Sequence, residues 1–253
     1  MRTDLAVFAA LVAFALATMP FYAASGSRAE YRRESGRRGT FVLGSFVREW
    51  FYWFIRPVER LSLALRLTPL FFNLAGATLG FVAGAFFATG SLVVGGWGVL
   101  LGGVADILDG RVARARGVAS RRGAFLDSTL DRFAEVGAFI GLAVYFRESA
   151  GAVALVAAAL GFSLLVSYAR ARGESVDVLC RQGVMQRAER LLSVGFGAIL
   201  DPSVTAWLGW DGGTLLLGVV ALVAAGTLGT AVYRTVWIAR RLPPIDPPDG
   251  SDP

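Results

Sequence analysis

Residues 93–146 read VVGGWGVLLGGVADILDGRVAR (93–114), ARGVASRRGA (115–124) and FLDSTLDRFAEVGAFIGLAVYF (125–146), and this stretch decides the fold. Its outer segments, Val93–Arg114 and Phe125–Phe146, are largely apolar and about 20 residues long, the length at which an α-helix crosses a bilayer. The Arg-rich turn between them is short, so we expect antiparallel neighbouring helices. Acidic residues lie in both segments at the end nearest this turn. The stretch therefore predicts a transmembrane helical hairpin with carboxylates gathered at one end.

The whole chain has the composition of an integral membrane protein. Of its 253 residues, 55% are hydrophobic and 17% are charged, and the mean hydropathy is +0.57. A soluble domain is roughly 45–50% apolar and lacks such long apolar runs. Further runs of spanning length are Pro69–Ala88, Ala150–Tyr168, Leu191–Leu208 and Thr214–Ala239. We therefore predict an all-α integral membrane protein with a core of six transmembrane helices.

Glycines in the first of these runs predict a close helix contact. Gly76, Gly80 and Gly84 recur at every fourth position and so lie on one helix face. Small residues at this spacing let a second helix backbone approach in the membrane.

Two segments precede this core. Leu5–Tyr22 is apolar and follows a weakly basic start, which favours an additional transmembrane helix over a cleaved signal peptide. Phe46–Leu67 mixes aromatic rings with charges, which predicts an amphipathic helix at the membrane interface, bent at Pro57. The expected organisation is an extra N-terminal helix at 1–26, an Arg-rich linker and interfacial helix at 27–67, the membrane domain at 68–242 and a disordered tail at 243–253.

The Arg-rich loops predict the orientation in the membrane. Loops 111–122 and 170–190 carry five Arg each, whereas the alternate loops are nearly free of net charge. Because basic loops stay on the cytoplasmic side, we expect a multi-pass protein of the cell (inner) membrane whose carboxylates face the cytoplasm.

Missing residue types exclude several kinds of chemistry. All 25 basic residues are Arg, and the chain contains neither Lys nor His. This excludes Ser-His-Asp and Cys-His nucleophilic pairs, imidazole-ligated metals, Schiff-base lysines and P-loop lysines. Cys180 is the only cysteine, so an internal disulfide is also excluded. Catalysis must rest on carboxylates, Arg, hydroxyls and a hard metal ion.

Four aspartates carry the chemical signal. Asp106 and Asp109 are three residues apart, and Asp127 and Asp131 are four apart, so each pair lies on one helix face. Four converging carboxylates repel one another unless cations neutralise them, and oxygen ligands select Mg²⁺ or Mn²⁺. The structural alternative is a set of interfacial salt bridges with Arg111, Arg114 and Arg132. Acidic residues inside membrane spans are costly and mark functional sites, so we favour a metal site and expect it to bind two ions.

These aspartates belong to a longer pattern. It reads Asp106-Ile-Leu-Asp109-Gly110-Arg-Val-Ala113-Arg114, eight residues, Gly123, three residues, Asp127, three residues, Asp131. The pattern resembles the signature of the CDP-alcohol phosphatidyltransferase family, and the resemblance covers roughly Pro69 to Arg241. It implies a six-helix core that transfers a substituted phosphate from a CDP-linked donor to an alcohol and releases CMP.

The resemblance also implies roles for individual residues. Asp106, Asp109 and Asp127 would hold the metal ions, while Asp131 would be shared between the second metal and the role of general base. The implied donor site is formed by Gly110, Ala113, Arg114 and Gly123. The chain departs from the family pattern at one place. Many members have the sequence Pro-Asn-x-x-Thr/Ser before the first core helix. Here Leu70 stands at the Asn position of this strip, and Asn73 stands at its Thr/Ser position. A nucleotide contact from this strip is therefore not expected.

A second cluster bears on the acceptor. The sequence Ser167-Tyr168-Ala169-Arg170-Ala171-Arg172 ends one span and Gln186-Arg187-Ala188-Glu189-Arg190 begins the next, which resembles the branch of the family that acts on inositol phosphate. Arginines can grip a phosphate monoester through bidentate hydrogen bonds, although positive-inside anchoring also explains single ones. The expected acceptor site is Ser167, Arg170, Arg187 and Arg234.

The predicted function is thus metal-dependent transfer of a phosphatidyl group from CDP-diacylglycerol to a polyol phosphate, with inositol phosphate favoured. The expected partners are these two substrates and membrane lipid, without nucleic acid, and the resemblance implies a homodimer. Alternatives within the family are a glycerol phosphate acceptor or a soluble CDP-linked donor such as CDP-inositol. A lipid donor, unlike a soluble one, requires a lateral opening from the bilayer to the aspartates. Two further alternative functions are a divalent-cation transporter and a catalytically inactive scaffold protein.

Overall fold

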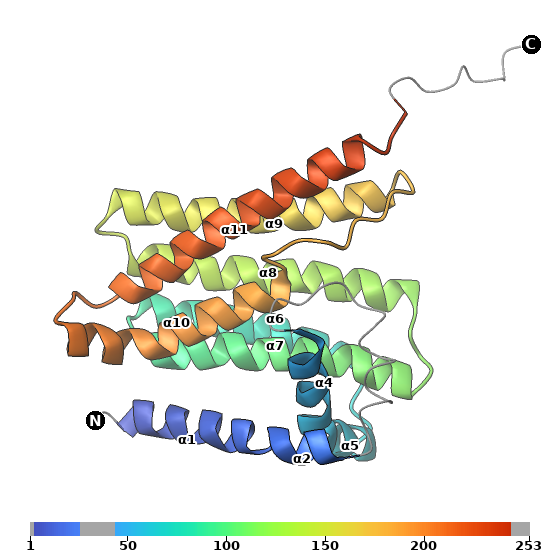
Figure 1. The fold of residues 1–253 in the computed structure, drawn as a ribbon, viewed down its shortest axis with the longest axis horizontal. Helices are drawn as coiled ribbons and strands as arrows, with labels where there is room; N and C mark the ends of the chain where they lie inside the picture. Colours follow the sequence, from blue (N-terminus) through green and yellow to red (C-terminus); the bar gives the residue numbers. More distant parts are fainter. Residues whose placement is uncertain (1–2, 26–43, 244–253) are drawn as a thin grey trace, which may run out of the picture.

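A computed structural model describes residues 3–25 and 44–243, which contain helices and no strand (Figure 1). The helices are α1 (Thr3–Ala17), α2 (Met19–Ala24), α4 (Gly44–Phe54), α5 (Arg56–Ala64), α6 (Pro69–Ala88), α7 (Leu92–Ala115), α8 (Arg121–Tyr145), α9 (Ala150–Glu174), α10 (Arg187–Leu208) and α11 (Thr214–Ala239). The Arg-rich part of the linker at 27–40 and the tail from residue 244 lie outside the described residues.

The bounds of the long helices follow from capping residues. Helix α6 begins as predicted because Thr68 accepts a hydrogen bond from the Phe71 amide and Pro69 occupies the first turn. Helix α8 begins at Arg121 rather than at Phe125, because Ser120 caps it by accepting from the Gly123 amide at 3.1 Å. Helix α10 likewise begins earlier than predicted, at Arg187. Charged residues thus extend the helices beyond their apolar cores.

Five of the described helices are long and apolar enough to cross a membrane: α6, α7, α9, α10 and α11. Helix α8 has 25 residues, but its first half carries the charges of Arg121, Arg122, Asp127, Asp131 and Arg132. The described residues therefore form an all-helical membrane protein with five helices of spanning length and composition, and α8 is not one of them.

The N-terminal segments are broken rather than continuous. The predicted helix Leu5–Tyr22 divides at Thr18 into α1 and α2, and Pro20 lies in the first turn of α2. The predicted interfacial helix Phe46–Leu67 divides at Ile55 into α4 and α5, and Pro57 lies in the first turn of α5, which confirms the expected bend. In Figure 1, α1 runs alongside the bundle, and α4 lies at the edge of the bundle, roughly perpendicular to α1.

Helix α6 lies at the centre of the packing. It contacts both α7 and α8, while α10 packs on α7, α9 packs on α8, and α11 covers α9 and α10. The expectation that α7 and α8 are direct neighbours is therefore largely wrong, since α6 lies between them for most of their length. The reason is the glycine ridge: a Cβ placed on Gly84 would come within 2.1 Å of the Gly137 carbonyl oxygen, and one on Gly80 within 2.5 Å of Ala134. Only glycine permits this close contact between α6 and α8.

Candidate active site

Three carboxylates converge where α7 ends and α8 begins. Ligand oxygens of Asp106, Asp109 and Asp127 lie within 4.8 Å of one another. The Asp109 side chain is buried, and one of its oxygens accepts a hydrogen bond from the Gly110 amide. Because the close group combines an i,i+3 pair on α7 with a residue of α8, it depends on the packing of both helices against α6. An all-oxygen set of three carboxylates fits a hard divalent cation such as Mg²⁺ or Mn²⁺.

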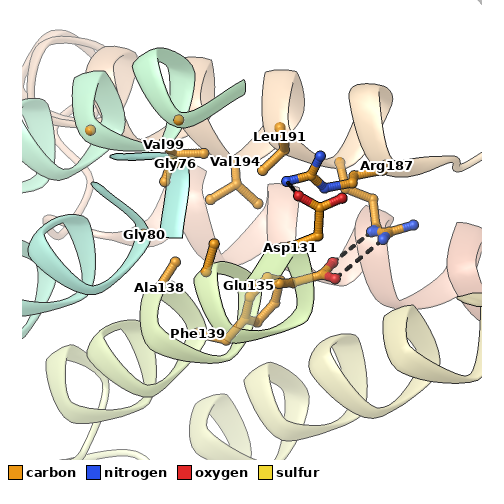
Figure 2. A pocket seen from close by; sticks show the side chains of 14 residues that line it. Gly76, Gly80, Val99, Asp131, Glu135, Ala138, Phe139, Arg187, Leu191 and Val194 are labelled. Atoms are coloured by element: carbon orange, nitrogen blue, oxygen red, sulfur yellow. Dashed lines mark hydrogen bonds and ion pairs between the residues drawn. The ribbon is translucent and has the colours of Figure 1, made fainter. Parts of the chain in front are cut away.

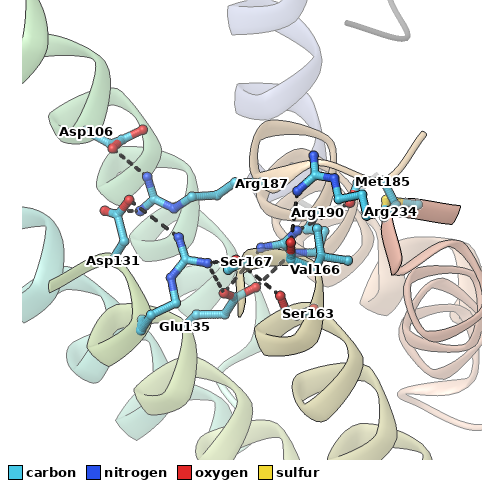
Figure 3. Close-up of polar contacts among 11 residues, drawn as sticks. Asp106, Asp131, Glu135, Ser163, Val166, Ser167, Met185, Arg187, Arg190 and Arg234 are labelled. Atoms are coloured by element: carbon cyan, nitrogen blue, oxygen red, sulfur yellow. Dashed lines mark hydrogen bonds and ion pairs between the residues drawn. The ribbon is translucent and has the colours of Figure 1, made fainter. Parts of the chain in front are cut away.

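Asp131 lies beside this group and is engaged by an arginine. Arg187, the first residue of α10, contacts an Asp131 oxygen at 2.6 Å and an Asp106 oxygen at 2.5 Å (Figure 3). One guanidinium therefore bridges α7 and α8 at the edge of the carboxylate cluster. This contact places Arg187 directly against two of the predicted site aspartates, whereas its position in the sequence only suggested that it would be near them.

A buried ion pair supports this edge of the site. Arg190 binds Glu135 with both ends of its guanidinium, at 2.8 and 3.3 Å, and donates to the Met185 carbonyl oxygen. Arg132 lies 3.8 Å from both Asp131 and Glu135 and donates to the Ser167 hydroxyl. Figure 3 shows the resulting network of alternating charges, which joins α7, α8 and α10 and reaches α9 at the Ser167 hydroxyl.

Glu135 was missed by the sequence reasoning, although a signal was present. It stands four residues after Asp131 and so lies on the same face of α8. Figure 2 shows Asp131 and Glu135 side by side, next to a small cavity of about 30 Å³ whose far side is lined by glycines of α6 and α7.

The salt-bridge alternative is met in part, by an arginine other than the expected ones, because Arg187 pairs with Asp106 and Asp131. Arg111 binds Glu59 of α5 at 2.7 Å and stacks on the Tyr52 ring at 5.1 Å, so it ties the N-terminal segment to α7. Arg132 approaches Asp131, but only at 3.8 Å.

All the predicted site residues line one open cavity of about 1720 Å³. These are Asp106, Asp109, Gly110, Ala113, Arg114, Gly123, Asp127, Asp131, Ser167, Arg170, Arg187 and Arg234. The residues expected for the metal, the donor and the acceptor thus share one space.

The three acceptor arginines differ in what they contact. Arg187 binds the carboxylates as described, whereas Arg170 pairs with Glu174 at 2.9 Å on the exposed end of α9. Arg234 is buried and donates to the carbonyl oxygens of Gln182 and Val166, each at 2.9 Å. Arg234 therefore fastens α11 to α9 and to the loop before α10 in addition to lining the cavity.

Part of the cavity lining is apolar, and we call this part the apolar arm. It is lined by Phe14, Leu16 and Met19 of the N-terminal helices, by Trp97 and Leu100 of α7, and by Phe196 of α10. Trp97 precedes Asp106 by nine residues on α7, which corresponds to roughly 13 Å along the helix axis. On α7 the apolar lining thus extends from the carboxylates toward the apolar middle of that helix, as a lipid substrate requires.

Comparisons with known proteins agree with this chemistry. The family model of CDP-alcohol phosphatidyltransferases matches residues 66–224. Archaetidylinositol phosphate synthase of Methanothermobacter thermautotrophicus is 32% identical over 189 residues, which cover 74% of this chain and 91% of that protein. Phosphatidylinositol phosphate synthase of Cutibacterium acnes is 37% identical over 194 residues, which cover 74% of this chain and 92% of the relative.

Solved structures give the same result. The crystal structure of Mycobacterium tuberculosis phosphatidylinositol phosphate synthase with CDP-DAG bound matches with a TM-score of 0.63 and 30% identity, covering 72% of this chain and 92% of that one. The structure of the same enzyme in complex with manganese and citrate has a TM-score of 0.63 and 31% identity, covering 72% and 88%. The family match begins at residue 66, so α1 to α5 lie outside it.

Proposed function

This chain belongs to the CDP-alcohol phosphatidyltransferase family, and from that premise we propose that it transfers the phosphatidyl group of CDP-diacylglycerol to inositol phosphate and releases CMP. It is an enzyme of phospholipid biosynthesis, as the relatives are. The observation that carries the proposal is the group of Asp106, Asp109 and Asp127 within 4.8 Å, inside a cavity that also has an apolar arm.

We assign the metal to these carboxylates. Asp106, Asp109 and Asp127 would hold Mg²⁺ or Mn²⁺, with Asp131 as a further ligand if two ions bind. The bound metal would neutralise charge on the phosphate oxygens of the donor. A manganese complex of the Mycobacterium tuberculosis relative supports this assignment.

The donor would lie along the end of α7. Gly110 and Ala113 leave room for the cytidine because neither has a bulky side chain, and Gly123 does the same at the start of α8. Arg114 can fork onto phosphate oxygens with two parallel hydrogen bonds. All four residues line the cavity that holds the carboxylates.

The acceptor would enter on the side of Arg187. Ser167, Arg170, Arg187 and Arg234 supply donors for its phosphate. Asp131 takes the proton of the acceptor hydroxyl while that oxygen bonds to the β-phosphorus of the donor, and the bond from this phosphorus to CMP breaks. Arg187 contacts Asp131 and Asp106 at once, so it can align the acceptor phosphate relative to the base.

The arrangement in the membrane follows from the same assignment. We propose that α8 is the sixth span of the core, because its charged half lines the cavity in which water and the substrate headgroups would lie. The core would then be 68–242, preceded by the extra helix (1–26) and the linker with its interfacial helix (27–67) and followed by the tail (243–253). The site would face the cytoplasm of the cell (inner) membrane, and the enzyme would act as a homodimer.

The test is a direct assay. Purified protein receives Mg²⁺ or Mn²⁺, CDP-diacylglycerol and one of several acceptors, and CMP release is measured. We expect release with inositol phosphate that stops when the metal is chelated. No release with any acceptor would overturn the enzymatic proposal, and release that survives Asp131→Asn would remove the base assignment. Activity with glycerol phosphate but not inositol phosphate would change the acceptor and leave the chemistry intact.

A further inference from the structure

Helices α1 and α2 form one wall of the cavity, although they lie outside the family-matched region. Phe14, Leu16 and Met19 line the apolar arm opposite residues of α7 and α10. Phe14 and Leu16 are 64% and 50% exposed, so their side chains are available to a molecule in the arm.

The α2 end of the α1–α2 unit is held in place by α4. The indole N–H of Trp50 donates to the Thr18 hydroxyl at 2.9 Å, and the fully buried Tyr22 donates to Glu49 at 3.4 Å. The Tyr22 ring packs on Phe46 and Trp53, with ring centroids 5.6 and 5.9 Å apart. The α1–α2 unit is therefore fixed at its α2 end by a polar and aromatic anchor.

The anchor itself is fastened to the active-site helix. Arg111 of α7 binds Glu59 of α5 and stacks on Tyr52 of α4. Arg111 is two residues from Asp109, so the position of α1 is coupled to the end of α7 that carries the carboxylates. Along its length α1 makes its bundle contacts with α10, which leaves the arm between α1, α7 and α10.

The size and chemistry of the space indicate what occupies it. Pockets for small molecules are roughly 300–1,000 Å³, and this cavity of about 1720 Å³ exceeds that range. The residues that line the arm are apolar, whereas the nucleotide and both phosphates need the polar end. An apolar space of this kind, continuous with a headgroup site, fits a hydrocarbon chain.

We infer that α1 and α2 form the outer wall of a binding site for an acyl chain of the lipid donor, and that this wall favours long-chain over short-chain donors. The inference rests on the proposed function and concerns a segment that lies outside the family model. Each methylene buried in the arm strengthens binding by about fourfold, so the wall acts on donor KM rather than on kcat.

The test compares donors that differ in chain length in mixed micelles of fixed composition. Phe14→Ala removes part of the wall, and Phe21→Ala is the matched control, because Phe21 lies on α2, is 72% exposed and does not line the cavity. We expect Phe14→Ala to raise the KM for dioleoyl CDP-diacylglycerol about tenfold with little change in kcat. The KM for the dihexanoyl donor, which buries far fewer methylenes against the wall, should change much less, and Phe21→Ala should change neither value.

A second measurement does not depend on a variant. A donor with a diazirine at the end of one acyl chain is irradiated with the unaltered protein, and labelled peptides are identified. Labelling within residues 12–19 supports the wall, and labelling confined to α6–α11 overturns it. Equal KM changes for both donors, or none, would also overturn it while the proposed function stands. If the unaltered protein released no CMP from any donor, the proposed function and this inference would both fall.

Discussion

Asp201 and Asp109 are buried carboxylates in two different regions of the bundle, and their surroundings differ: backbone amides surround one, and other carboxylates surround the other. Asp201, far along α10, is fully buried, and its two oxygens accept hydrogen bonds from the amides of Gly213 and Leu216 at 2.8 and 2.9 Å. It thereby caps the start of α11. Asp109, near the end of α7, is also buried, but it faces two other carboxylates within 4.8 Å.

On the proposed function, this difference separates a structural acid, Asp201, from a metal ligand, Asp109. Arg187 and Asp201 are fourteen residues apart on α10, roughly 21 Å, so the two regions do not share partners. The backbone of the fold satisfies Asp201 completely. Three aspartates in close contact repel one another, and the chain places one guanidinium, that of Arg187, against Asp106 and Asp131, so a bound metal ion would relieve the repulsion that remains.

The largest expected effect is on activity. Asp109→Asn keeps an oxygen that can accept from the Gly110 amide but removes a charged metal ligand. We expect CMP release to fall at least about a thousandfold, about 4 kcal/mol, because neutralisation of phosphate charge is lost. The measurement is CMP release at saturating substrates, with gel filtration and circular dichroism to show that the fold persists. A loss of less than tenfold would mean that Asp109 is not a ligand.

An intermediate case is Glu135, a buried acid satisfied by an arginine instead of by backbone amides. Arg190→Met leaves the Glu135 charge without its bidentate partner, which should lower the free energy of unfolding by about 3–4 kcal/mol. The double variant with Glu135→Leu should recover part of that loss, as judged by unfolding in detergent. Additive losses in the double variant would show that the two side chains do not interact.

At the structural acid, Asp201→Ala leaves the Gly213 and Leu216 amides buried without an acceptor. We expect a loss of about 3 kcal/mol in the free energy of unfolding. CMP release per folded molecule should be unchanged, because the substitution is remote from the carboxylate cluster. A selective loss of activity at full stability would contradict the separation of the two regions.

Metal binding should distinguish the two regions without an activity assay. Manganese at about a hundred times its dissociation constant should raise the free energy of unfolding by about 2.7 kcal/mol. Asp201→Asn should keep this increment, and Asp109→Asn should lose most of it. The readout is the thermal midpoint with and without Mn²⁺, and an equal increment in both variants would place the metal elsewhere.

The bounds of some helices and the pairing of aspartates on one helix face could be predicted from the sequence, because both depend on local spacing. Helix α6 and helix α11 begin and end at the predicted residues, since cap and apolar run coincide there. The i,i+3 spacing of Asp106 and Asp109 places both on one face whatever the tertiary packing.

The helix packing order and the partners of the site arginines could not be predicted, because they depend on contacts between segments far apart in the sequence. The interposition of α6 requires Gly80 and Gly84 to meet α8 at Ala134, Gly137 and Gly141, and only the α6 half of that contact was anticipated. The distinction between Arg187 at the carboxylates and Arg170 at the surface depends on how α10 docks on α7. The two N-terminal helices reach the cavity through contacts with α4, which no local pattern indicates.

The smallest effect is the sharpest test of the comparison, because the same substitution should act with opposite sign in the two regions. In protein freed of metal by a chelator, Asp109→Asn removes one of three neighbouring like charges and should raise the free energy of unfolding by about 1 kcal/mol. Asp201→Asn instead turns its amide N–H₂ toward a backbone N–H and should lower it by about 1.5 kcal/mol. Both are measured by thermal unfolding in the same detergent. If Asp109→Asn also destabilises the metal-free protein, its carboxylate is satisfied by the chain, and the acidic end of α7 is a structural element like Asp201.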